Sequence, residues 1–174
     1  MSQPRVRPPA KPVGGDPITA SALGHQPESL QAFLRLYGTL WSHGIVDQPT
    51  KEMARIRNAR IVDCVVCKNT RFAGPREQGL TEDIVDQIRD GFEASDLTPR
   101  QKAVLRWTDA FLSPEPAPDE ALRQEMLRHF KPAELVELTA AISIFMGFSK
   151  IAVSLGGMPE TLPIMVEKTP DWPQ

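Results

Sequence analysis

Apolar residues recur at helical spacing through most of this 174-residue chain, and this periodicity limits the possible folds more than any other feature. Side chains three and four residues apart share one face of a helix, which can then pack against a core. The stretch 28–43 carries such a stripe, formed by Leu30, Phe33, Leu34, Tyr37, Leu40 and Trp41. Alternating runs of β-branched residues are missing, so the sequence predicts an all-α fold without a sheet.

Start and stop signals divide the periodic sequence into separate helices. Thr98 and Gln101 have the spacing of a capping box, and the segment from the cysteine pair to Gln78 is expected to be one helix. The expected helices cover about residues 28–43, 50–63, 64–78, 81–91, 98–112, 119–130 and 132–155. The last of these is apolar on almost every side, so we expect it to be the central buried helix.

Composition divides the chain into three parts. Residues 1–27 are rich in proline and glycine and poor in large apolar side chains, which predicts a flexible N-terminal arm. Such an arm is either dispensable or becomes ordered on a partner. Residues 28–165 are predicted to form one helical domain, and residues 166–174 a C-terminal tail.

Charge and hydropathy exclude several classes of partner. The chain has 20 basic and 22 acidic residues, a net charge of -2, so it has no excess charge that would attract nucleic acid or an anionic membrane. We see no run approaching the roughly eighteen apolar residues of a membrane-spanning helix. The sequence therefore predicts a cytoplasmic protein that binds neither nucleic acid nor membrane.

The two cysteines, Cys64 and Cys67, lie three residues apart. On a helix this spacing brings the Cα atoms within about 5 Å, which a disulfide can bridge. If the chain is helical from Asp63, Lys68 and Arg71 share the cysteine face, and their charge would favour the reactive thiolate. Thiol redox chemistry, metal binding and an inert buried pair are all compatible with this pattern.

Metal binding is the weaker interpretation. A structural zinc site needs four ligands, whereas the histidines His25, His43 and His129 are scattered and no second cysteine pair exists. We therefore predict no metal and no cofactor. Glu52 lies near a helix start between Lys51 and Arg55, where an acidic side chain also has a structural explanation.

The segment from Glu52 to Cys67 (EMARIRNARIVDCVVC) resembles the core of the carboxymuconolactone decarboxylase superfamily, in its alkylhydroperoxidase D-like branch. A glutamate stands at this distance before a CxxC motif in that family. The segments 79–83, 97–101 and 135–139 extend the resemblance over about residues 30–160. The resemblance implies an alkylhydroperoxidase D-like helical bundle, with the CxxC at the start of a helix and protomers assembled as trimers or hexamers.

The resemblance also implies a peroxidase-like activity. Cys67 would attack a hydroperoxide and become a sulfenic acid, Cys64 would resolve it as a disulfide, and a separate thiol reductant would reopen the pair. Glu52 would belong to the site. The peroxidase members have a histidine four residues after the second cysteine, and Arg71 stands there in this chain.

Arginine stays protonated, so Arg71 is expected to stabilise the thiolate or to pair with Glu52, but not to relay protons. The alternatives to a peroxidase are a redox sensor or small-ligand binding protein of the same family, and a carboxymuconolactone decarboxylase-like lyase.

Overall fold

The computed structural model describes residues 5–11, 21–115, 118–156 and 159–172. The arm predicted for residues 1–27 lies partly outside these residues. Within them, the backbone amide of Arg5 donates to the carbonyl of Leu155, and Ala22–His25 forms a 3-10 helix. The N-terminal region is thus joined to the end of the last helix at Arg5.

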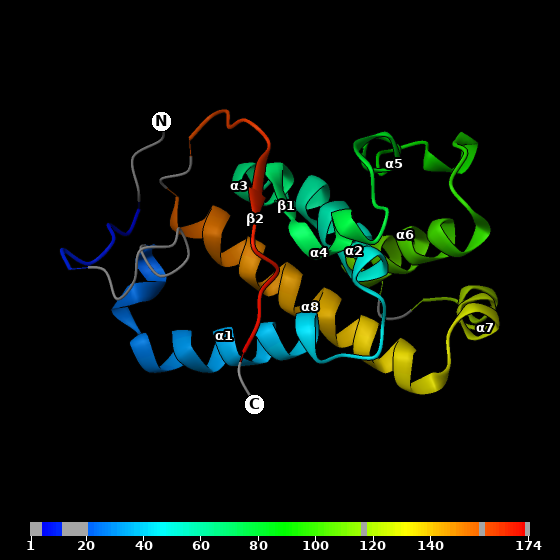
Figure 1. Ribbon diagram of the computed structural model, residues 1–174, viewed down its shortest axis with the longest axis horizontal. Coiled ribbons are helices and arrows are strands. Elements are labelled where there is room, and N and C mark those ends of the chain that lie inside the picture. Colours follow the sequence, from blue (N-terminus) through cyan, green and yellow to red (C-terminus); the bar gives the residue numbers. More distant parts are fainter. Residues whose placement is uncertain (1–4, 12–20, 116–117, 157–158, 173–174) are drawn as a thin grey trace.

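The described residues are mainly helical, as predicted (Figure 1). The long helices are α1 (Pro27–Ser42), α2 (Gln48–Val62), α6 (Pro99–Leu112), α7 (Glu120–His129) and α8 (Pro132–Leu155). The short ones are α3 (Val65–Asn69), α4 (Ala73–Glu77), α5 (Glu82–Asp86) and the 3-10 helix Phe92–Ala94. The capping box at Thr98 is present, because its side chain and that of Gln101 each accept a hydrogen bond from the other's backbone amide.

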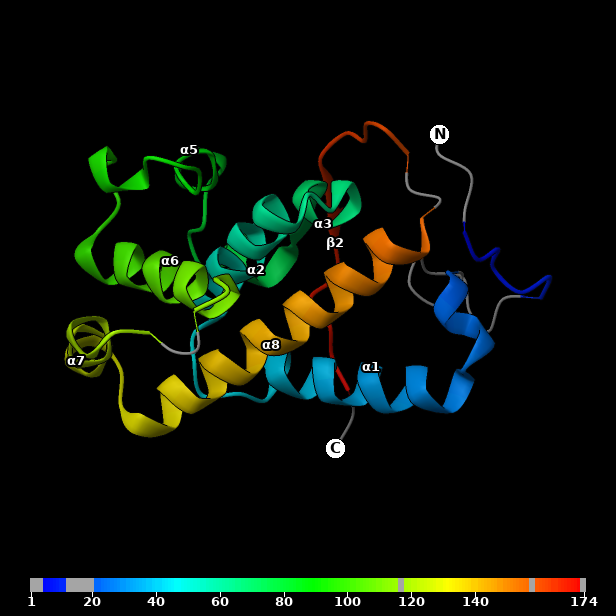
Figure 2. The same cartoon turned by 180° about the vertical axis from the view of Figure 1, so that it is seen from behind.

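The central buried helix is α2, and the expectation that α8 would fill this place is wrong. Every residue from 51 to 59 is buried, because α2 packs against both α6 and α8 (Figures 1 and 2). The sequence concealed this role because α2 carries charged side chains all round. Those charges are paired after folding: Lys51 contacts Glu137, and Arg57 donates to Asp109.

Helix α8 has an exposed side as well as a buried one. Only 28% of its most apolar window is buried in the structure. By length and composition alone α8 could cross a membrane, which corrects the expectation that no such segment exists. The core helices of water-soluble proteins meet the same two criteria of length and composition.

An aromatic cluster between α1 and α8 supports the region of the cysteines. Tyr37 and Trp41 of α1 pack with Phe145 of α8 and with Phe72, which follows the cysteine helix. Separate apolar clusters join α2 to α6, α7 and α8 and join α2 to α5. The cysteine segment therefore lies next to packed side chains from two helices, α1 and α8, and from Phe72.

Two short strands contradict the prediction of a sheet-free fold. Strand β1 (Thr70–Phe72) pairs in parallel with β2 (Met165–Glu167), with Arg71 opposite Val166. The expected helix 64–78 is consequently broken into α3, β1 and α4. Strands of three residues are too short for an alternating pattern, and their pairing joins segments distant in sequence, so sequence periodicity could not reveal them.

Adjacent residues of α7 provide a test of this packing. Met126 is completely buried, whereas Leu127 is 46% exposed. Met126→Ala should lower the free energy of unfolding by about 3 kcal/mol, because it removes buried methylenes and leaves a cavity. Leu127→Ala is the control and should change stability far less. Chemical denaturation of both variants measures the difference, and equal losses would contradict the arrangement of α7.

Candidate active site

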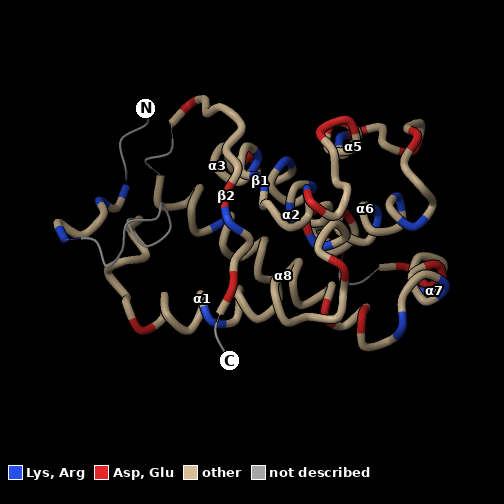
Figure 3. The backbone as a smooth tube through the Cα atoms, in the orientation of Figure 1, with Lys and Arg blue, Asp and Glu red and all other residues tan. Residues whose placement is uncertain are grey.

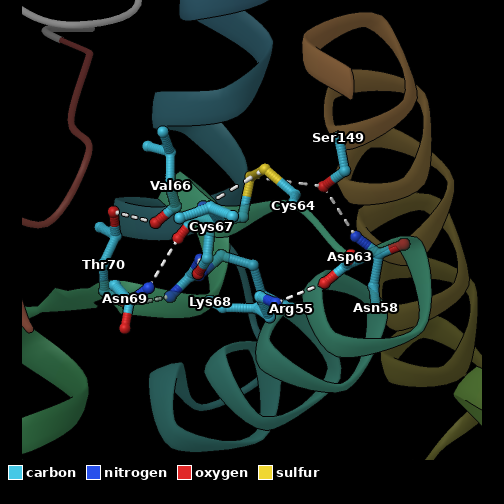
Figure 4. The surroundings of a disulfide bond; sticks show 11 residues. Arg55, Asn58, Asp63, Cys64, Val66, Cys67, Lys68, Asn69, Thr70 and Ser149 are labelled. Carbon is cyan, nitrogen blue, oxygen red and sulfur yellow. Dashed lines mark hydrogen bonds and ion pairs between the residues drawn. A yellow bond between two sulfur atoms is a disulfide. The ribbon is translucent and has the colours of Figure 1, made fainter. Parts of the chain in front are cut away.

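A sharp turn places the cysteine pair at the end of the central helix. Asp63 ends α2 in the left-handed conformation, with φ of 57°, and Cys64 becomes the N-cap of α3. The Sγ of Cys64 accepts a hydrogen bond from the amide of Cys67 at 3.3 Å. The two cysteines form a disulfide with Cα atoms 5.2 Å apart, as the spacing predicted (Figure 4).

Glu52 forms a buried ion pair with Arg55, one turn further along α2. Arg55 Nε and Nη2 donate to the two carboxylate oxygens at 2.6 and 2.7 Å. The same guanidinium donates to the carbonyls of Cys67 and Thr70 at 2.8 and 2.6 Å. Burial alone would lower the pKa of Arg55, but Glu52 more than offsets this and raises it. The pair therefore fixes the backbone around Cys67.

Arg71 lies in a different environment from the one predicted. Its side chain donates to Glu82 and to the carbonyls of Lys68 and Thr70. The expected ion pair between Arg71 and Glu52 is wrong, because Arg55 occupies both oxygens of Glu52. Lys68 also pairs away from the sulfur atoms, with Asp63. The predicted stripe of cysteines and cations is lost because the helix ends at Asn69.

Cys67 opens onto a cavity of about 410 Å³, whereas Cys64 is completely buried. The cavity is lined mainly by aromatic and aliphatic side chains, among them Phe72 and Phe148. One wall comes from the C-terminal segment, through Met165 and Trp172. Residues 166–172, expected to form a tail, thus contribute to the site.

Polar groups reach Cys67 from two other helices. Ser149 of α8 donates from Oγ to the Sγ of Cys67 at 3.5 Å, and Asn58 of α2 donates to Ser149 at 3.0 Å.

Tyr37 of α1 also lines the cavity. Burial raises the pKa of Tyr37 to about 12, although the charge of Arg55 acts in the opposite direction. The phenol is therefore neutral and available as a hydrogen-bond donor.

Sequence reasoning located Cys64, Cys67 and Glu52 but missed Arg55, Tyr37 and Ser149. The position of Arg55, three residues after Glu52, was an available signal for a helical ion pair. Tyr37 was seen only as part of an apolar stripe. Nothing near Ser149 in sequence distinguishes it from other serines, since its contact with Cys67 exists only after α8 packs on α2. In the described part of the chain, no group of three or more His, Cys, Asp or Glu side chains could hold a metal ion.

Comparisons with known proteins agree with this geometry. The model of the carboxymuconolactone decarboxylase family matches residues 27–110. An uncharacterized protein of Mycobacterium tuberculosis is 34% identical over 112 residues, which cover 64% of this chain and 39% of that relative. The uncharacterized protein YdfG of Bacillus subtilis is 22% identical over 113 residues, covering 64% of this chain and 76% of YdfG.

Two solved structures share the fold. The alkylhydroperoxidase AhpD core of an uncharacterized peroxidase-related protein from Ralstonia eutropha has a TM-score of 0.70 and 21% identity, covering 85% of this chain and 79% of that one. A protein of unknown function from Agrobacterium tumefaciens has a TM-score of 0.68 and 24% identity, covering 79% and 94%. The helical arrangement therefore defines an AhpD-like fold. Over residues 27–110, just under half of its length, the chain is similar to the carboxymuconolactone decarboxylase family.

The single tyrosine of the chain permits a direct test of the cavity. Absorbance titration should show Tyr37 ionising near pH 12 in the folded protein, and near about 10 after denaturation. Because the pKa is higher in the folded state, folding stability should fall as the pH rises from about 10 towards 12. Tyr37→Phe should lack the transition. If Tyr37 in the folded protein ionised at the same pH as in the denatured protein, burial of the phenol would be contradicted.

Proposed function

We propose that the protein is a thiol-dependent peroxidase-like oxidoreductase. The Cys67 thiolate attacks a hydroperoxide, the O–O bond breaks, and the products are a Cys67 sulfenic acid and, after protonation, an alcohol or water. The Cys64 thiol then attacks the sulfenic sulfur, which forms the disulfide and releases water. A separate dithiol or two thiols would reduce the disulfide by exchange.

The observation that carries this proposal is the unequal placement of the two cysteines. Cys67 faces the cavity, where a peroxide can bind, and Cys64 lies buried behind it within bonding distance. This order supports attack by Cys67 and resolution by Cys64. The Ralstonia neighbour is called peroxidase-related, and the Agrobacterium neighbour a suggested antioxidant defence protein, which agrees with this chemistry.

Glu52 and Arg71 have supporting roles in this proposal. Glu52 holds Arg55, which in turn fixes the carbonyls on either side of the site. Arg71 links α3 and β1 to α5 through Glu82. Because the Arg71 guanidinium contacts these groups and not the sulfur, it stabilises the Cys67 thiolate only through its positive charge at longer range. The apolar lining of the cavity favours an organic hydroperoxide over hydrogen peroxide.

Stopped-flow measurement of thiol loss provides the test. The reduced protein should consume an organic hydroperoxide faster than hydrogen peroxide, and much faster than a small model thiol does. Cys67→Ser should abolish the fast phase, whereas Cys64→Ser should leave it and accumulate sulfenic acid. Reaction no faster than the model thiol would instead support the second candidate, a redox sensor or small-ligand binding protein, which the same cavity and disulfide also favour.

We also propose that the protein is a cytoplasmic homo-oligomer. Acidic and basic positions are mixed around α5, α6 and α7, whereas long stretches of α1 and α8 carry neither (Figure 3). Leu36 on α1 and both Val136 and Ile151 on α8 are exposed apolar side chains. A second copy would bury this surface.

Light scattering at micromolar concentration should give a mass greater than that of one chain, consistent with a trimer or hexamer. Val136→Glu places a charge on the exposed side of α8 and should shift the mass towards the monomer, if that side is buried between copies. Gln124→Glu, at an exposed position of α7 away from that side of α8, is the control for one added negative charge. A monomeric mass for the unmodified protein would contradict the proposed assembly.

A further inference from the structure

Ser149 is a buried residue of α8 whose hydroxyl is held between two side chains. Its Oγ donates to the Sγ of Cys67 at 3.5 Å and accepts a hydrogen bond from Nδ2 of Asn58 at 3.0 Å (Figure 4). Ser149 is 3% exposed and Asn58 is completely buried. The hydroxyl therefore lies in a largely buried position at the cavity wall, against the sulfur of Cys67.

The arrangement of donors and acceptors directs the serine proton towards sulfur. A hydroxyl has one proton to donate and lone pairs to accept with. Because the Asn58 amide donates to Oγ, the proton is left for Cys67. The other end of the amide, Oδ1, is buried without a hydrogen-bond partner among the described residues. Burying the unpaired Oδ1 of Asn58 costs folding free energy. The site keeps this amide nevertheless, and its Nδ2 donates to Ser149.

We propose that Ser149 is the hydrogen-bond donor that stabilises the Cys67 thiolate in the reduced protein, and that Asn58 is the residue that positions its hydroxyl. This inference rests on the proposed function, in which Cys67 is the reacting thiol. A thiolate accepts hydrogen bonds more strongly than a disulfide sulfur does. A hydrogen bond to the charged form favours that form and lowers the thiol pKa.

The charged side chains around Cys67 do not direct a hydrogen-bond donor at its sulfur, so we assign the stabilisation of the thiolate to a neutral donor. The ionisable groups that line the cavity or lie behind it come from α1, α2 and the C-terminal segment: Tyr37, Glu52, Arg55, Glu167, Lys168 and Asp171. On α3 itself, Lys68 pairs with Asp63. The charge of Arg55 is paired with that of Glu52. The Arg55 Nη1 group donates to the backbone carbonyl of Cys67 and not to its sulfur. Ser149 is the side chain whose donor is directed at the sulfur.

The test measures the ionisation of Cys67 without any peroxide. In a Cys64→Ser background Cys67 is the only thiol, so its rate of alkylation by iodoacetamide from about pH 5 to about pH 10 reports its pKa. Ser149→Ala should raise the midpoint by about one pH unit, the size expected for losing a hydrogen bond to a charged group. Ser149→Thr keeps the hydroxyl and should return the midpoint towards its original value.

Ser143→Ala is the matched control. It makes the same substitution on the same helix, at an exposed residue whose hydroxyl donates to the carbonyl of Ala140. Its alkylation profile should match that of the parent protein. Circular dichroism of each variant verifies that α8 is intact. An unchanged midpoint in a folded Ser149→Ala protein would overturn the inference.

Asn58→Leu separates positioning from direct contact. This change removes the amide with little loss of volume, so it should raise the midpoint by less than Ser149→Ala does. Combined with Ser149→Ala it should add nothing, since Asn58 acts through the hydroxyl. A full additional shift in the double variant would overturn the role of Asn58.

The experiments distinguish a failure of this inference from a failure of the peroxidase proposal. A raised midpoint in Ser149→Ala, together with no rapid peroxide reaction in the parent protein, would support the role of Ser149 and refute the peroxidase activity. Rapid peroxide reaction with an unshifted midpoint would refute only the role of Ser149.

Discussion

The buried ion pair between Glu52 and Arg55 is the interaction on which the site depends. Two charged groups in the interior require nearly complete hydrogen bonding, because each loses its hydration. Here the glutamate accepts two hydrogen bonds from the guanidinium, and the carbonyls of Cys67 and Thr70 accept two more. Removing either charge would leave its partner unpaired in the core, a loss of several kcal/mol in comparable cases. The position of the cysteine backbone is therefore coupled to the folding of α2.

The ion pair also explains how the chain leaves the cysteine helix. Arg55 holds the carbonyl of Thr70, the first residue of β1, and stacks over the ring of Phe72 at 4.9 Å. The amide of Phe72 donates in turn to Glu52 at 3.4 Å. Helix α3 thus ends after five residues, and β1 becomes available to pair with β2. That pairing brings the C-terminal segment over the cavity, where Met165 and Trp172 form part of its wall.

The sulfur of Cys67 has apolar side chains on its cavity side and polar groups on the other side. Aromatic side chains from α1, β1 and α8 face the cavity, and hydroxyl and amide groups from α8 and α2 lie behind Cys67. An apolar pocket by itself raises the pKa of a thiol, because burial disfavours the charged form. A hydrogen bond donated to the sulfur lowers the thiol pKa and so opposes the effect of burial. A neutral donor does this without burying another charge that would itself need a partner. The neutral Tyr37 phenol fits the same environment.

The sequence by itself determined the helical class, the position of most helices and the identity of the cysteine pair with its preceding glutamate. These features follow from local spacing: periodic apolar residues, capping residues, and two thiols one helical turn apart. The tertiary structure decided which helix is central, which arginine meets Glu52, and what approaches Cys67. Those contacts join α2 to α8 and β1 to β2, which are far apart in sequence, so no local pattern encodes them. Arg71 shows the difference: helical spacing placed it beside the thiols, but the end of α3 turned it towards Glu82.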